Sequence, residues 1–247
     1  MESQAYAALA FEEDHHWWFE GRRQILRDLL HTHLRPNGTR RILDVGCGTG
    51  GMFPLLSELG HVEGADGSAE AIAYATERFP AFTVHAVRLP DELPGADWDA
   101  ITAFDVVEHL DEPVAALTTI REHLAPGGQV VVTVPAYQAL WSHHDVVHHH
   151  KRRYRRALLT EHLHAAGLRA TYMTHFNSWL LPAIAGVRFA SRLVPGRDQP
   201  SDDGGDLKQT PALVNRALTW LFASERAVLR IAPLPAGVSI FAVAERA

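Results

Sequence analysis

The chain has 247 residues, of which 47% are hydrophobic, and a formal net charge of -6. This length and apolar content can bury one large core, which predicts one domain with elaborations. The acidic balance gives no footprint for nucleic-acid binding, and a single cysteine excludes an internal disulfide framework. The sequence begins with polar and acidic residues instead of a secretory pattern, so we expect a cytoplasmic protein that binds no nucleic acid.

Residues 1–39 are expected to form a helical lead, with helix over roughly residues 4–33. Two adjacent tryptophans, Trp17 and Trp18, cannot both face one side of this helix. We expect one to cover the core and the other to face a ligand cleft, with Trp18 as the candidate for the cleft. Arg22 or Arg23 could bind a ligand carboxylate or lie on a solvated helix face.

An apolar strand over residues 41–45 leads into three alternate glycines, Gly46, Gly48 and Gly50. Glycine tolerates positive φ and lets a ligand approach bare backbone, and a helix over residues 52–59 is expected to follow. Dinucleotide enzymes use the different spacing G-x-G-x-x-G to hold a pyrophosphate. Here Asp44 precedes the first glycine by two residues, where it would repel a pyrophosphate but could face an ammonium group. This pattern favours S-adenosylmethionine, which carries an amino acid and a ribose but no phosphate.

A second acid, Asp66, ends the next expected strand, residues 61–65. It lies about twenty residues beyond the glycine loop, where a carboxylate can accept both hydroxyls of a ribose. Ser68 is expected to cap a helix over residues 69–79. The two acids therefore predict contacts to opposite ends of one nucleoside ligand.

Four motifs in order, at residues 41–51, 61–68, 101–110 and 124–134, resemble those of class I S-adenosylmethionine-dependent methyltransferases, particularly the ubiquinone-pathway O-methyltransferase group. Strand and helix patterns alternate, which implies right-handed crossovers. We therefore expect an α/β fold: a Rossmann-like, doubly wound, seven-stranded sheet, mostly parallel with an antiparallel last strand. The resemblance makes the lead a lid over the cofactor. A nucleotide-binding α/β domain of another kind is the alternative.

The resemblance also implies cofactor contacts along the carboxyl edge of the sheet. Relatives usually place an acid after strand three to receive the adenine amino group, but residues 84–89 offer none. The backbone near residues 87–89, or Asp91, must serve instead. The expected cofactor-binding residues are Asp44, Gly46, Cys47, Gly48, Gly50, Asp66, Gly67, Arg88, Leu89, Asp105, Val106 and Arg22.

Residues 105–109 also resemble the acid-x-x-Glu-His segment with which ubiquinone-pathway O-methyltransferases and small-RNA-end methyltransferases bind a divalent ion. A later histidine would complete the shell. The same residues occur in metal-free relatives, where Glu108 and His109 begin a helix and shape the cofactor pocket. We therefore predict no metal site, with a divalent metal as the alternative.

The histidine-rich segment 141–154 follows the fifth strand and is expected to overhang the carboxyl edge. An oxygen or nitrogen acceptor must lose a proton, which favours a histidine base. We expect His148 or His149 as that base, and a solvated or structurally hydrogen-bonded ring is the alternative for each. Trp141 and Tyr154 are expected to line the acceptor pocket with Trp18, and Asp145 to orient an imidazole. The arginines at 152, 153, 155 and 156 either begin a solvated helix or bind an anionic acceptor.

The core is expected to span residues 40–175, followed by a helical insertion, 176–235, and the last strand, 236–247. The insertion contains an apolar segment, 176–193, a polar run, 196–209, that is expected to be mobile, and a helical segment, 211–230. Pro182, Arg188 and Arg192 interrupt the apolar segment, so no transmembrane span is predicted. It could cover the substrate pocket, dock a partner subunit, rest on a membrane surface, or simply pack against the sheet.

The sequence thus predicts methyl transfer from S-adenosylmethionine, with S-adenosylhomocysteine as product, to an oxygen, nitrogen or carbon atom of a small or amphipathic metabolite. A hydrophobic or lipid-linked acceptor would suit an apolar cover over the pocket. A non-catalytic S-adenosylmethionine-binding regulator or scaffold is the alternative, and the glycine spacing disfavours a nicotinamide-dependent oxidoreductase. We expect a monomer or homodimer with, at most, peripheral membrane contact.

Overall fold

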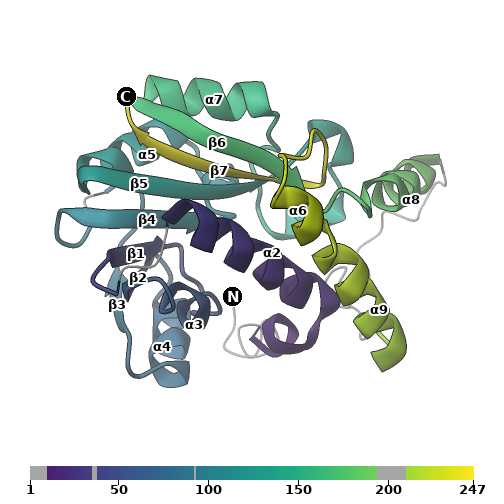
Figure 1. Ribbon diagram of the computed structural model, residues 1–247, viewed down its shortest axis with the longest axis horizontal. Coiled ribbons are helices and arrows are strands. Elements are labelled where there is room, and N and C mark those ends of the chain that lie inside the picture. Colours follow the sequence, from purple (N-terminus) through teal and green to yellow (C-terminus); the bar gives the residue numbers. More distant parts are fainter. Residues whose placement is uncertain (1–9, 35–37, 92, 194–209) are drawn as a thin grey trace.

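A seven-stranded sheet in the order β3-β2-β1-β4-β5-β7-β6 forms the centre of the molecule (Figure 1). The computed structural model describes residues 10–34, 38–91, 93–193 and 210–247. Strand β7 is antiparallel to both of its neighbours, and every other neighbouring pair in the sheet is parallel. The expected fold class is therefore confirmed. The strands are β1 (Arg41–Val45), β2 (His61–Asp66), β3 (Thr83–Ala86), β4 (Trp98–Phe104), β5 (Leu124–Pro135), β6 (Leu168–Phe176) and β7 (Ser239–Arg246).

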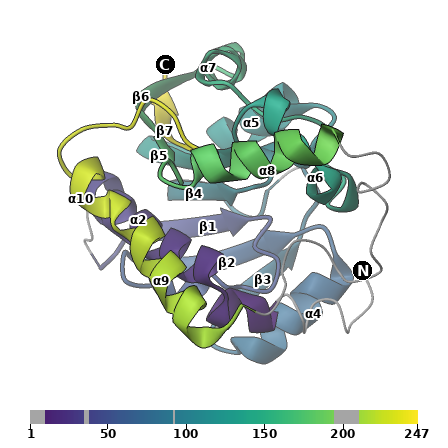
Figure 2. The same cartoon turned by 90° about the vertical axis from the view of Figure 1, so that its right-hand side faces the viewer.

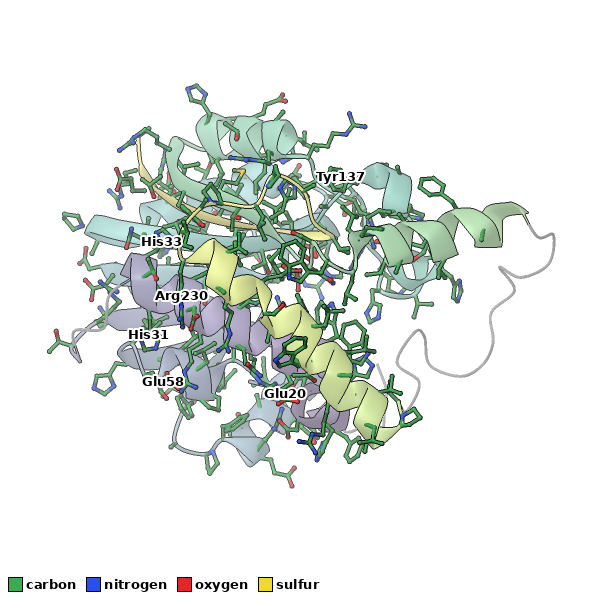
Figure 3. The ribbon with its side chains drawn as sticks, turned by 45° about the vertical axis from the view of Figure 1, so that its right-hand side comes forward. Glu20, His31, His33, Glu58, Tyr137 and Arg230 are labelled. Atoms are coloured by element: carbon green, nitrogen blue, oxygen red, sulfur yellow. The ribbon has the colours of Figure 1, made fainter. Side chains whose placement is uncertain are left out.

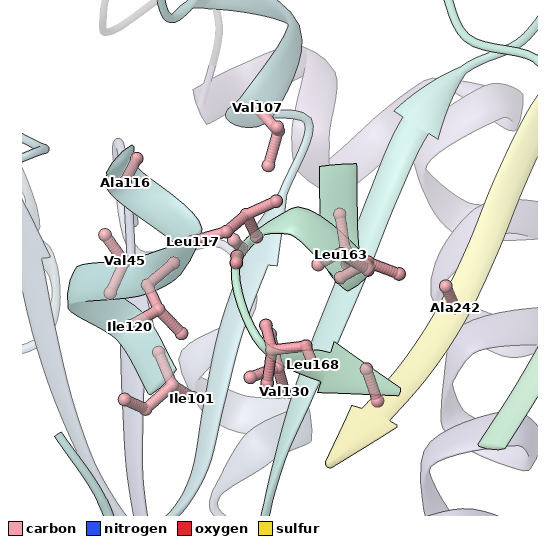
Figure 4. Close-up of a cluster of buried hydrophobic side chains, with 14 of the residues drawn as sticks. Val45, Ile101, Val107, Ala116, Leu117, Ile120, Val130, Leu163, Leu168 and Ala242 are labelled. Atoms are coloured by element: carbon pink, nitrogen blue, oxygen red, sulfur yellow. The ribbon is translucent and has the colours of Figure 1, made fainter. Parts of the chain in front are cut away.

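Helices cover both faces of this sheet. On one face, α5 (Pro113–Glu122) and α7 (Arg156–Ala165) pack Leu117, Ile120 and Leu163 against the strand residues Ile101 and Val130 (Figure 4). The opposite face is covered by α2 (Trp17–Leu34), α3 (Phe53–Leu56), α4 (Ala69–Arg78) and α10 (Glu225–Leu229). Successive strand residues point to opposite faces, so each buried strand contributes to both cores.

The strand order reverses between β1 and β4, which both adjoin the centre of the sheet. In open α/β sheets, ligands bind outside the carboxyl ends of the strands at such a reversal. Three further elements lie beyond this edge. After β5 come the short helices η2 (Gln138–Leu140) and α6 (His143–Val147), and after β6 comes α8 (Leu181–Leu193).

Several predicted helices are shorter or interrupted. The helix expected over residues 52–59 is the single turn α3, and the lead is helical over residues 10–15, breaks at His16 and resumes as α2. The late helical segment divides at Ser224 into α9 (Ala212–Ala223) and α10. Strand β5 begins five residues before the expected residue 129, because the Pro-Gly-Gly turn lies within an irregularity of its pairing with β4.

The predicted mobile run, 196–209, lies outside the described residues, and the predicted domain boundaries stay a prediction. Within the described ranges, each helix is too short or too polar to cross a bilayer.

Candidate active site

The glycine loop after β1 exposes its backbone. Gly46 has a φ of 67°, and a Cβ there would lie 2.5 Å from the side chain of Val106, so the loop after β4 packs directly on it. Gly48 has a φ of 55°, and a Cβ at that position would meet nothing within 4 Å. The loop is held from below, because the amides of Gly46 and Cys47 both donate to the Ala65 carbonyl. It therefore forms a cradle that a side chain at Gly48 would fill.

Asp66 ends β2 directly beside this cradle. Its Oδ2 accepts a hydrogen bond from the Gly48 amide, and its Oδ1 accepts one from the Ser68 amide, each at 2.9 Å. A carboxylate oxygen has a second lone pair, so each oxygen can accept one further donor. Two hydroxyls on adjacent ribose carbons would supply those donors. Ser68 also caps α4 as predicted, by accepting from the Ala71 amide at 3.3 Å.

Asp44 is almost fully buried at the end of β1. Its Oδ1 accepts the Thr102 hydroxyl at 2.6 Å. Burial raises the pKa of Asp44 to about 7, with a smaller increase from Asp66, while Thr102 and Arg22 oppose the increase. A carboxyl group in this state gains most from a positively charged ligand group nearby.

The other predicted cofactor residues line the same edge. Cys47 is buried, and burial raises the pKa of its thiol, so it serves as a small loop residue rather than a nucleophile. Gly67 lies beside the segment after β3, because a Cβ on it would be 3.5 Å from the Cβ of Arg88. Leu89 is buried in the core. Residues after β1, β2 and β3 therefore meet at the carboxyl edge.

The helical lead closes over the glycine loop through contacts that the sequence did not predict. The Glu13 carboxylate accepts from the Thr49 hydroxyl at 2.5 Å and from Arg78 at 2.7 Å. Arg78 also donates to both carboxylate oxygens of Asp14, each at 2.7 Å. These partners are 36 to 65 residues apart in the sequence, so no local pattern could have indicated them.

Arg22 reaches the end of β4 from α2. Its guanidinium donates to the Asp105 carboxylate at 2.6 Å and to the Thr133 hydroxyl at 3.0 Å. Its charged carbon lies 5.2 Å from the centre of the half-buried Trp18 ring. The predicted roles of Arg22, Asp105 and Trp18 stay predictions, but the three residues do lie together.

The segment after β4 forms a candidate metal site. Glu108 is fully buried, and within the part of the chain that the structure describes neither of its carboxylate oxygens has a hydrogen-bond partner. Burial and the nearby Asp105 raise its pKa well above the usual value. Potential ligand atoms of Glu108, His109 and His150 all lie within 4.8 Å of one another. Burial and the neighbouring His150 lower the pKa of His109 to about 4, so this ring is a neutral donor at pH 7.

Asp145 fixes His150 in this cluster. Its buried carboxylate accepts from His150 Nδ1 at 2.8 Å and from Arg153 Nε at 2.7 Å. Although burial alone would raise the pKa of Asp145, these two partners hold it well below its usual range. A histidine that uses Nδ1 in this way presents Nε2 to a ligand. The Asp145 expected to orient an imidazole does so, and the ring it contacts is that of His150.

The predicted base and pocket residues are more dispersed. His148 is half-buried, with its ring 6.1 Å from that of His150, and His149 is exposed with a φ of 55°. Tyr154 is fully buried, and its hydroxyl lies 3.3 Å from His162 Nδ1. Trp141 is half-buried beside α6.

The sequence analysis did not single out Tyr137. This residue follows β5 on the same side as α6 and α8 (Figure 3). Its hydroxyl lies 3.3 Å from His175 Nε2. The roles of His148, His149, Trp141 and Tyr154 stay predictions.

Comparison with known proteins agrees with this arrangement. A methyltransferase domain family model matches residues 18–175. An uncharacterized methyltransferase of Mycobacterium tuberculosis is 32% identical over 109 residues, which cover 42% of this chain and 55% of the relative. A ubiquinone biosynthesis O-methyltransferase of Aeromonas salmonicida is 30% identical over 106 residues, covering 38% of this chain and 42% of that protein.

Solved structures with a similar fold are also found. A methyltransferase in complex with the Haloferax volcanii Trm112 methyltransferase activator aligns with a TM-score of 0.62 and 18% identity, covering 99% of this chain and 97% of the other. At this identity the likeness shows the fold alone. The chain spans about half the length of the curated relatives it matches.

The doubly wound sheet and the glycine cradle flanked by Asp44 and Asp66 define a class I methyltransferase domain. The chain belongs to the methyltransferase domain family, and the resemblance noted in the sequence is confirmed.

Proposed function

We propose that this chain is an enzyme that binds S-adenosylmethionine in the glycine cradle and transfers its methyl group to a small or amphipathic metabolite. The observation that carries the proposal is the pairing of Asp66 with Gly48. It sets a carboxylate with two remaining acceptor positions beside bare backbone. Asp66 would accept the ribose hydroxyls, and Asp44 would face the ammonium group. These two contacts fix the cofactor at both ends.

The cofactor supplies a methyl group on a sulfonium, which leaves as a neutral thioether when the acceptor attacks. The protein then has mainly to align the acceptor and exclude water, which can lower a barrier by up to about 7–11 kcal/mol. Glu13, bonded to Thr49 and Arg78, closes the lead over the loop and would exclude water. A histidine after β5 would take the acceptor's proton, with His148 and His149 as the predicted candidates.

The acceptor binds, in this proposal, on the β4–β5–β6 side of the edge, because the cradle occupies the β1–β2 side. Buried and half-buried polar groups gather there, including Glu108, His109 and His150. The O-methyltransferase of ubiquinone biosynthesis among the relatives supports an amphipathic acceptor.

A divalent metal is the second element of the proposal. The buried, unpartnered carboxylate of Glu108 and the neutral ring of His109 fit a metal ion, with His150 oriented by Asp145. An ion held there would supply a positive charge to orient an acceptor oxygen. The sequence analysis predicted no metal site. The ligand atoms of these three residues nevertheless suit a divalent metal, and we include the metal in the proposal for that reason.

Calorimetry with S-adenosylmethionine, S-adenosylhomocysteine and NAD tests the cofactor assignment. We expect the first two to bind and NAD not to bind. Asp66→Ala should weaken binding at least about tenfold, since charge-assisted hydrogen bonds contribute roughly 1.5–3 kcal/mol. Asp99→Ala is the matched control, because Asp99 lies at the start of β4, at the opposite edge of the sheet, and accepts only from the Arg41 amide among the bonds described.

Tight NAD binding without S-adenosylmethionine binding would refute the proposal, and an unchanged affinity in Asp66→Ala would refute the ribose contact. Transfer of a labelled methyl group to small molecules of a cell extract separates an enzyme from a binding scaffold.

A further inference from the structure

Large apolar side chains are exposed on three elements beyond the carboxyl edge of the sheet. We call these residues the apolar rim. Val187 on α8 is 70% exposed, and Leu213 and Trp220 on α9 are 74% or more exposed. The full rim consists of Val146 and Val147 on α6, Trp179, Val187 and Phe189 in and before α8, and Leu213, Val214, Trp220 and Leu221 on α9. Exposed apolar groups of this number, gathered on one side, mark an interaction surface.

The helices that carry the rim lie on one side of the molecule. Figure 2 looks onto the right-hand side of Figure 1 and shows α8 and α9 at the front, with α6 beside α8. In Figure 1, α8 projects from the body. A bond from Arg188 to the Leu140 carbonyl ties α8 to the segment that leads into α6. The helices that carry the rim therefore lie on this side of the molecule, and α8 projects there from the body.

All charged residues of the two longer helices, α8 and α9, are basic. The sequences of α8 and α9 contain three arginines, at positions 188, 192 and 216, and no acidic residue. Apolar and aromatic side chains with basic companions are typical of helices that lie in the interface of a bilayer. Tryptophan is enriched there because its ring is apolar and its N–H is polar, and the rim has two tryptophans.

The helices of the rim lie near the candidate active site. Helices α6 and α8 follow β5 and β6, whose carboxyl ends lie at the edge that carries Asp44 and Asp66. Helix α9 packs along α2, whose Arg22 reaches Asp105 at the same edge. A surface that covered the rim would therefore lie beside the carboxyl edge of the sheet, where the acceptor binds in the proposed function.

We propose that the apolar rim rests on a phospholipid surface, so that an amphipathic acceptor passes from the bilayer to the site. The membrane contact itself stands on the rim alone, and only the route of the acceptor rests on the proposed methyl transfer. Anionic lipid strengthens the contact through Arg188 on α8 and Arg216 on α9.

Sedimentation of the full chain with phosphatidylcholine vesicles, with and without phosphatidylglycerol, tests this proposal. Wild type should sediment with vesicles, more strongly when phosphatidylglycerol is present. The double variant Val187→Glu/Phe189→Glu and the single variant Trp220→Glu should each lose at least about tenfold in partitioning, since burial of one large apolar side chain accounts for roughly that factor. Ile231→Glu is the matched control, because Ile231 is 87% exposed but lies after α10, outside the rim.

The proposal is overturned if wild type stays in the supernatant with both lipid mixtures, or if the rim variants bind as well as Ile231→Glu. A dimer in light scattering that the rim variants abolish, without vesicle binding, assigns the rim to a second copy and also overturns it. S-adenosylhomocysteine calorimetry on the same variants keeps the two proposals apart, because the rim substitutions are exposed and should leave that affinity unchanged.

Discussion

Asp44 illustrates how a single buried carboxyl group can serve ligand binding at the expense of stability. Its side chain is shielded from water and bonded only to the Thr102 hydroxyl among the described contacts. The pKa of about 7 means that the free protein holds this group neutral below that pH. In an unfolded chain the pKa of aspartate is about 3.9. The contribution of Asp44 to the free energy of unfolding therefore falls as pH rises from about 4 to about 7 and is constant above that.

The cofactor should reverse this balance. An ammonium group beside Asp44 favours the ionised carboxylate, so affinity for S-adenosylhomocysteine should rise with pH up to about 7 and then level off. Below that pH the affinity should fall by up to about tenfold per pH unit, because one proton is released on binding. Asp44→Asn should bind more weakly at pH 8, lack this pH dependence, and unfold at a higher temperature without cofactor. Calorimetry and thermal unfolding from about pH 5.5 to about pH 8.5, a range that brackets the raised pKa of Asp44, check this prediction. An affinity that depends on pH equally steeply in wild type and in Asp44→Asn would contradict it.

Glu108 presents a different residue-scale question, because its buried carboxyl has no hydrogen-bond partner among the described residues. If it is a metal ligand, wild type should bind Mn²⁺ or Zn²⁺, and Glu108→Gln should bind at least about tenfold more weakly. Asp145→Asn should have a smaller effect, since it acts by orienting His150. Glu112→Gln, an exposed carboxylate at the start of α5, is the matched control. Calorimetry with each metal measures these affinities, and the absence of any binding to wild type would remove the site.

At the scale of elements, local sequence signals predicted the strands and the positions of two acids at the carboxyl edge. Asp44 lies one residue before the end of β1 and Asp66 ends β2, where the sequence pattern places them. No local signal indicated the break in the lead at His16. The backbone groups on either side of it, the Trp17 amide and the His15 carbonyl, find their hydrogen-bond partner in Asn215 on α9.

The choice among the later histidines was also beyond local pattern. The run from His148 to His150 is uniform in sequence, but the left-handed turn at His149 and the bond to Asp145 bring His150 to Glu108. A sequence of three identical side chains cannot indicate which one faces a neighbour, because that depends on the φ of the middle residue. Tertiary contacts, and not local sequence preference, therefore determine that His150 is the histidine of this run that lies near Glu108.

At the scale of the whole molecule, the helical lead and helix α9 of the late insertion pack together on one side of the sheet (Figure 1). Helix α9 packs along α2, where a Cβ on Gly21 would lie 2.7 Å from the Phe222 ring. Asn215 then bridges the break in the lead: its Oδ1 accepts from the Trp17 amide at 2.8 Å, and its Nδ2 donates to the His15 carbonyl at 2.9 Å. The late insertion thereby holds the lead in the position from which Glu13 reaches the glycine loop.

Loss of this bridge should loosen the lead and weaken cofactor binding without any change in the cradle. Asn215→Ala removes two hydrogen bonds, which should lower the free energy of unfolding by about 1–3 kcal/mol. Affinity for S-adenosylhomocysteine should fall several-fold, because part of the binding energy is then used to order the lead. Arg216→Ala, on the next residue of α9, is the matched control. Hydrogen exchange at the Trp17 amide reports the bridge directly, and unchanged protection there with unchanged affinity would show that the insertion does not hold the lead.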